Sequence, residues 1–178
     1  MIGILKIAAY ICERYKEEYG EAIDEMKLHK LLYFTQRECM IQTGKPMTSA
    51  AFEAWKYGPV SSYIHNKFMK GKLGGPLSTD LGYFYQPIFD KVFELYAPKD
   101  AWSLSILSHG EISWQRARQG IPSDQNSSRK LSTSDIQEDA ARIRLRRFLL
   151  KEKTVPVWDQ ACMSKTEATE GYPCLCGK

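Results

Sequence analysis

The sequence lacks long hydrophobic runs, internal repeats and a strong excess of one charge. Its apolar stretches, such as residues 7–12, are far shorter than the ~20 residues of a membrane-spanning helix, so we expect no membrane association. No basic segment precedes the first apolar stretch, and Ile2 instead of glycine follows Met1. We therefore expect neither a secretion signal nor N-myristoylation. Hydrophobic residues make up 43% and charged residues 26% of the 178 residues, which excludes a disordered or fibrous protein.

The cysteine content and the net charge are both too low to assign the chain to a class of proteins. The five cysteines are odd in number and irregularly spaced, at Cys12, Cys39, Cys162, Cys174 and Cys176. Without an export signal a disulfide framework is not expected, and the chain is predicted to act in a reducing cytoplasm. The formal net charge of +4 is too small to mark a dedicated nucleic-acid-binding domain.

Metal-binding motifs are also missing. His29, His65 and His109 fall on three separate predicted segments and have no metal-binding spacing. Cys174 and Cys176 form one close pair, and Cys162 adds a third thiolate, whereas a closed zinc site needs four ligands. We therefore expect no metal and no cofactor.

Signatures of catalysis are absent in the same way. Ser61, Ser62 and Ser108 are possible nucleophiles, but none lies in a Gly-x-Ser-x-Gly elbow. Ser108 and His109 are neighbours in sequence, which does not by itself place a base beside a nucleophile. No glycine-rich stretch is followed by the Lys-Ser/Thr pair that cradles phosphate. We expect a protein that is not an enzyme, and a hydrolase or metal enzyme built on His109 is the alternative to test.

The periodicity of apolar residues predicts a mainly α-helical, compact domain with a small two-stranded β element. Helices are expected over residues 4–19, 24–43, 60–70, 88–97, 100–109, 112–118 and 134–151. The second helix should bury one stripe of its surface, and the last should begin with a capping box of Ser134 and Gln137 and carry a buried stripe that extends to Leu150. Residues 52–57 alternate like a strand that stops at 58–59, with 47–50 as its expected partner.

A basic stretch lies on the last predicted helix, at Arg142, Arg144, Arg146 and Arg147. One interpretation is a face that binds an acidic partner or the phosphates of a nucleic acid. The other is a solvated surface near the end of a helix, where cations are favourable. Arginines spaced by two spread around a helix and do not line one side of it, which favours the second interpretation.

Aromatic residues flank several predicted turns and helix ends. The set is Trp55, Tyr57, Tyr63, Trp102 and Trp114. Such side chains are usually core residues with one polar atom, and they are also frequent anchors of protein interfaces. The sequence predicts core positions for Trp55 and Trp114 and does not separate core from interface for the others.

Several ordered blocks resemble the Panacea domain, the family of SocA-like antitoxins and GepA-like phage-associated proteins. They read LHKLLYF at 28–34, GKPM at 44–47, FEAWKYGPV at 52–60 and LSILSHGEISWQRAR at 104–118. The chain departs from the family pattern at His29, where glutamine is frequent, and at Ser108 and Ser113, which replace threonine and proline. The resemblance extends over residues 1–150, which we take as the domain, and leaves 151–178 as a tail to which nothing is transferred.

The resemblance implies an antitoxin of a prokaryotic toxin–antitoxin system that neutralises a toxin encoded by a neighbouring gene through direct protein contact. One branch of the family delivers its toxin to a protease, so masking and proteolytic delivery both stay open. A nucleic-acid-binding regulator that uses the basic helix is the alternative function. The signature residues, which form either scaffold or interface, are Lys30, Leu31, Leu32, Tyr33, Trp55, Tyr57, Gly58, Pro59, His109 and Trp114.

Overall fold

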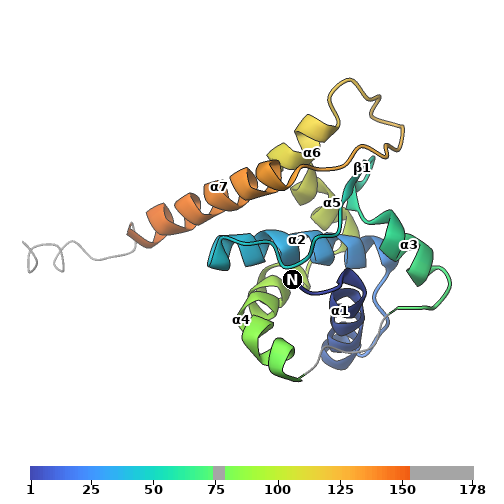
Figure 1. Ribbon diagram of the computed structural model, residues 1–178, viewed down its shortest axis with the longest axis vertical. Coiled ribbons are helices and arrows are strands. Elements are labelled where there is room, and N and C mark those ends of the chain that lie inside the picture. Colours follow the sequence, from blue (N-terminus) through green and yellow to red (C-terminus); the bar gives the residue numbers. More distant parts are fainter. Residues whose placement is uncertain (74–78, 153–178) are drawn as a thin grey trace, which may run out of the picture. The chain divides into compact units, whose positions relative to one another are not determined.

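Helix α2 (Glu25–Thr43) is the centre of the fold in the computed structural model, which describes residues 1–73 and 79–152 (Figure 1). Helices α1 (Ile4–Tyr19), α4 (Thr79–Tyr96) and α5 (Ala101–His109) pack against it. Every residue of α2 from the third to the seventeenth is buried, so the prediction of a single buried stripe was wrong. A helix that is covered on several sides has no solvent-exposed face for its polar residues. Its polar side chains must therefore form hydrogen bonds or ion pairs inside the protein.

The ends of the first two helices confirm the sequence prediction. Gly20 and Gly44 end α1 and α2 with a φ of 72°, a left-handed conformation that glycine adopts without strain. Asp24 caps α2, because its carboxylate accepts a hydrogen bond of 2.8 Å from the backbone N–H of Lys27. The short connection between the two caps lets α1 and α2 pack as neighbours.

The β element is a hairpin of β1 (Glu53–Trp55) and β2 (Gly58–Val60), with Ala54 opposite Pro59. The prediction that the strand stops at 58–59 and pairs with 47–50 was therefore wrong. The backbone N–H groups of Met47 and Thr48 both donate to Gln36 Oε1 at 3.0 Å. These N–H groups therefore already have a hydrogen-bond partner on α2. On the outer side of β1, residues 129–131 add backbone hydrogen bonds of 2.8 Å.

The remaining helices differ from the prediction mainly at their starts. Helix α3 (Ser62–Phe68) begins after a Ser61 cap, because Pro59 belongs to β2. Helix α4 contains Pro87 and begins well before the predicted residue 88. Helix α6 (Ile112–Ala117) lies as predicted. No described helix is both long and apolar enough to cross a bilayer.

Helix α7 (Thr133–Glu152) begins at a different cap from the predicted one. The hydroxyl of Ser132 accepts the backbone N–H of Asp135 at 3.0 Å, so Ser132 takes the capping role that we assigned to Ser134. The predicted buried stripe also ends early, since 54% of Leu150 is exposed. The chain divides into two units, Met1–Ile143 and Arg144–Lys178, and the boundary falls inside α7.

Candidate partner-binding surface

Lys30, the lysine of the α2 signature, binds the β-hairpin to α2. Lys30 is fully buried and donates a hydrogen bond of 3.3 Å to the Pro59 carbonyl. Burial lowers the pKa of Lys30 from 10.5 to about 7. Gly58 has a φ of 105°, and an added Cβ would overlap Ser108 Oγ and lie 2.7 Å from Lys30 Cε. Only glycine therefore lets the hairpin approach α2 and α5 this closely.

The second signature block fixes the other side of the hairpin. Trp114 stacks on His109 with 4.1 Å between ring centroids and donates a hydrogen bond of 3.0 Å to the Trp55 carbonyl. Both tryptophans are half-buried, so they lie at the border of the core. The prediction that Trp55 and Trp114 are core residues was therefore wrong in this respect. Burial, and then the nearby charge of Lys30, lower the pKa of His109. These contacts give the block a scaffolding role.

A buried polar network joins α2 to the start of α6. The Tyr33 hydroxyl lies 3.0 Å from Ser113 Oγ and 3.3 Å from Asp139 Oδ2. Asp139 accepts the N–H groups of Ile112 and Ser113 at 2.7 and 3.0 Å, which caps α6 from α7. Burial is the main cause of a Tyr33 pKa well above its usual value, and the nearby carboxylates add to it. Leu31 and Leu32, the other α2 signature residues, belong to the hydrophobic core.

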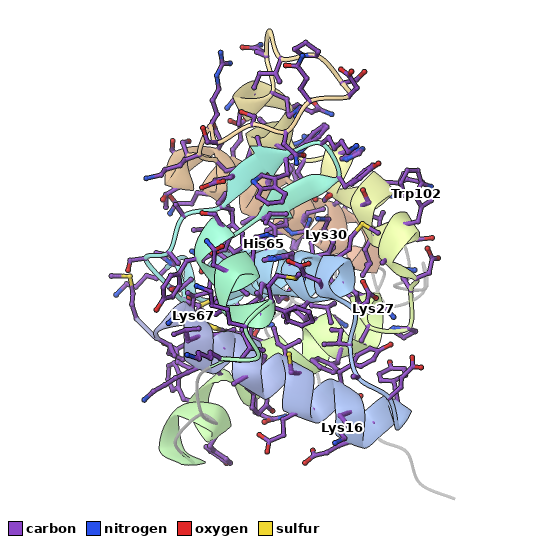
Figure 2. The ribbon with its side chains drawn as sticks, turned by 90° about the vertical axis from the view of Figure 1, so that its right-hand side faces the viewer. Lys16, Lys27, Lys30, His65, Lys67 and Trp102 are labelled. Carbon is purple, nitrogen blue, oxygen red and sulfur yellow. The ribbon has the colours of Figure 1, made fainter. Side chains whose placement is uncertain are left out.

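The scaffold presents an exposed apolar surface, formed by Tyr57 on the hairpin turn and Trp102 and Ile106 on α5. These side chains expose 44%, 57% and 58% of their area. The two aromatic rings meet edge to face at 5.9 Å, and Ile106 follows Trp102 by one helical turn. Trp102 projects away from α5 into solvent, while Lys30 lies inside the fold (Figure 2). Exposed tryptophan and tyrosine are typical anchors of protein interfaces.

The described residues around His109 are not arranged for nucleophilic catalysis. Ser108 is fully buried, and its hydroxyl donates to the Ser105 carbonyl at 2.7 Å, not to a base. Ser61 caps α3 and Ser62 donates to Glu53 Oε1 at 2.7 Å. Each of the three serine hydroxyls therefore has a structural hydrogen-bond partner.

The arginines of the basic stretch lie on both sides of the unit boundary. Arg142 is exposed in the first unit; Arg144 and Arg146 are exposed in the second, where Arg147 is half-buried. Their role in binding a partner stays a prediction. The tail cysteines Cys162, Cys174 and Cys176 lie outside the described residues.

The histidines differ most from the sequence analysis, which placed them on three separate segments without metal-binding spacing. His29 is only 2% exposed in the middle of α2, and His65 on α3 lies beside the same Glu25 carboxylate. The spacing of Glu25 and His29 by four residues was a usable signal, since it places both on one face of a helix. His29 and His65 are 36 positions apart in the sequence, so nothing in the sequence indicates that they are close in space.

Comparison with known proteins agrees with the hairpin-centred signature. Residues 28–84, which run from α2 through the hairpin and α3 into α4, match the family described as antitoxin SocA-like, Panacea domain. This segment belongs to the Panacea domain family. The Panacea match is shorter than the region in which we found a resemblance, and the α5–α6 block lies outside it.

A curated Panacea relative is Antitoxin SocA of Caulobacter vibrioides (strain NA1000 / CB15N), which is 39% identical over 46 residues. The alignment covers 26% of this chain and 24% of that protein, so the chain spans about a quarter of its relative's length. No solved structure matches the chain.

Proposed function

We propose that this protein is an antitoxin that neutralises a protein toxin by direct contact. The observation that carries the proposal is the Panacea match over residues 28–84, whose family is described as SocA-like antitoxin. The signature residues support a binding protein over an enzyme. Lys30, Gly58 and Trp114 hold a hairpin in place, and the described side chains around His109 include no paired nucleophile and base. We place its action in the cytoplasm and its domain in residues 1–150.

The toxin-binding surface in this proposal is the exposed patch of Tyr57, Trp102 and Ile106. Two aromatic rings and a branched aliphatic side chain supply apolar area that a partner protein can bury. Tyr57 stands within the matched segment, so the family signature itself sets the position of one anchor. The Ser105 hydroxyl donates to the Tyr57 carbonyl at 2.9 Å and ties the turn to α5, which keeps the two halves of the patch together.

The proposal includes two modes of neutralisation that share the same contact. The bound toxin is either masked or presented to a protease. In the first mode toxin accumulates as a stable complex, and in the second its cellular level falls while the antitoxin persists. Pulse-chase measurement of toxin half-life with and without this protein separates them.

Co-expression tests the proposal. The product of the adjacent gene should arrest growth alone, and growth should return when this protein is induced with it. The two proteins should co-purify when the toxin carries an inactivating substitution. A neighbour that is harmless alone, or toxicity that persists without any complex while this protein is folded and abundant, contradicts the antitoxin role.

A further inference from the structure

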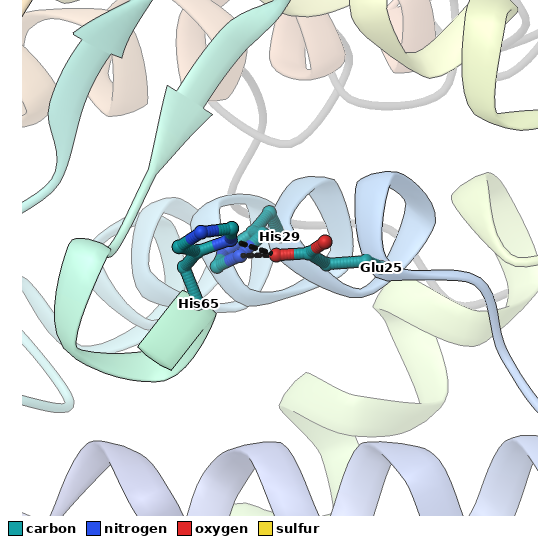
Figure 3. A group of neighbouring side chains, drawn as sticks. All are labelled: Glu25, His29 and His65. Atoms are coloured by element: carbon teal, nitrogen blue, oxygen red, sulfur yellow. Dashed lines mark hydrogen bonds and ion pairs between the residues drawn. The ribbon is translucent and has the colours of Figure 1, made fainter. Parts of the chain in front are cut away.

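Three potential metal ligands converge from two helices. Glu25 and His29 lie on one face of α2, and His65 reaches across from α3 (Figure 3). Their ligand atoms all lie within 4.8 Å of one another. Glu25 Oε1 is 3.5 Å from His29 Nε2 and also contacts His65 Nδ1. The carboxylate oxygen thus stands between two imidazole rings that are distant in sequence.

The central imidazole lacks a partner that its burial calls for. His29 is 2% exposed, and its Nε2 makes no hydrogen bond to any described residue. Native proteins rarely leave a buried polar atom unsatisfied unless a ligand, ion or water completes it. The unsatisfied nitrogen faces the other two ligand atoms and not the core.

We propose that Glu25, His29 and His65 bind one divalent transition-metal ion, with zinc as the best match to the ligand set. Two imidazole nitrogens and one carboxylate oxygen are a ligand set of zinc and of related borderline cations. Glu25 and His65 expose 29% and 34% of their side chains, so an ion can enter and a fourth position stays open to solvent. The bound ion joins α3 to α2, and the site is independent of the antitoxin role.

The ring protons of both histidines have to move for this site to form. His65 Nδ1 donates to the Glu25 carboxylate without the metal, so its proton moves to Nε2 when Nδ1 binds the ion. His29 Nδ1 now accepts the Ser61 backbone N–H at 3.4 Å, which places the ring proton on Nε2. Metal binding at Nε2 shifts that proton to Nδ1 and gives up the Ser61 contact. The contact is longer than a typical N–H hydrogen bond of roughly 2.7–3.2 Å and is therefore weak. Its loss leaves two buried N–H groups facing each other, a cost that zinc binding has to exceed.

Zinc titration of the full chain tests the site. The protein should carry Cys162→Ser, Cys174→Ser and Cys176→Ser, because thiolates in the tail could bind zinc on their own. Calorimetry should show one zinc per chain, and zinc should raise the melting temperature. Glu25→Gln and His65→Gln should each raise the dissociation constant at least ~10-fold. Glu17→Gln, an exposed carboxylate on α1, is the matched control and should bind as the parent does.

A second measurement needs no ligand variant. Addition of zinc to the cysteine-free-tail protein should shift the NMR signals of two of its three histidine rings and leave those of His109 in place. Absence of zinc binding at millimolar concentration overturns the site. Equal affinity of the parent and the His65→Gln protein, or a shift of the His109 signals alone, also overturns it. None of these outcomes bears on rescue from the toxin.

Discussion

Substitution of Gly58 by alanine probes how closely the hairpin is pressed onto α2 and α5. The φ of 105° is unfavourable for a residue with a side chain, which costs about 1–2 kcal/mol. The added Cβ would also meet Ser108 Oγ and Lys30 Cε. Both side chains are held in place, because Ser108 Oγ donates to the Ser105 carbonyl and Lys30 Nζ donates to the Pro59 carbonyl. Overpacking of this kind costs about 1–3 kcal/mol. We expect Gly58→Ala to lose about 2–5 kcal/mol of the ~5–15 kcal/mol that stabilises a domain.

Urea denaturation followed by circular dichroism measures this loss, and Gly120→Ala is its control. Gly120 also has a positive φ, of 73°, but an added Cβ there meets nothing within 4 Å. Its cost should be the backbone term alone. Ser108→Ala in the Gly58→Ala background should recover part of the loss, since it removes one of the overlapping atoms. A Gly58→Ala protein that is no less stable than Gly120→Ala would refute the proposed close packing.

Three further predictions concern stability. Burial of the charged form of Lys30 costs about 5 kcal/mol of folding free energy, because the pKa of Lys30 falls from 10.5 to about 7. Lys30→Met should therefore stabilise the protein at pH 7 by about 2–4 kcal/mol, after the loss of the Pro59 hydrogen bond is subtracted. Between pH 7 and 10.5 the Lys30 amine is protonated in the unfolded chain and neutral in the folded protein, so the stability of the wild type should rise with pH across that window. The stabilisation by Lys30→Met should therefore be smaller in urea titrations at pH 10 than at pH 7. Trp114→Ala should cost about 2 kcal/mol in the same assay, less than the ~3–5 kcal/mol of a fully buried tryptophan, and a larger loss would place it in the core. Charge reversal at Arg142 and Arg146 should change the free energy of unfolding by no more than ~0.5 kcal/mol, with weaker toxin capture in a pull-down only if the basic stretch contacts the toxin.

Local signals in the sequence predicted the ends of α1 and the cap residues of α2 well. Asp24, Gly20 and Gly44 act within one turn of their own helix, so their effects can be predicted without the rest of the fold. The environment of α2 could not be predicted in this way. Arg37 and Glu38 look like solvent-facing residues, and only the helices that surround α2 bury them. The prediction of the strand partner was wrong for a related reason. The Gln36 side chain accepts the backbone N–H groups of residues 47 and 48, which we had expected to pair with the strand.

The candidate sites depended on contacts between distant segments. The sequence marked Tyr57 and Trp102 as aromatic residues near turns, but their exposure follows from the way α5 packs beside the hairpin. The family signature left scaffold and interface open for its residues, most of which are buried. His29 and His65 approach each other only because the hairpin returns the chain to α2 before α3 begins. No periodicity encodes such a return, so the cluster became visible only in the fold.

The most direct test of the central claim is rescue from the toxin by a protein that lacks its exposed tryptophan. Trp102→Ser removes the largest anchor of the patch, and Tyr83→Ser, an 86% exposed aromatic residue on α4, is the matched control. Both variants should melt close to the wild type, because exposed substitutions change stability little. We predict that the Tyr83→Ser protein restores growth and that the folded Trp102→Ser protein does not, with toxin binding weakened at least ~10-fold, the loss expected when an interface anchor is truncated. A folded Trp102→Ser protein that binds and rescues like the wild type contradicts the account.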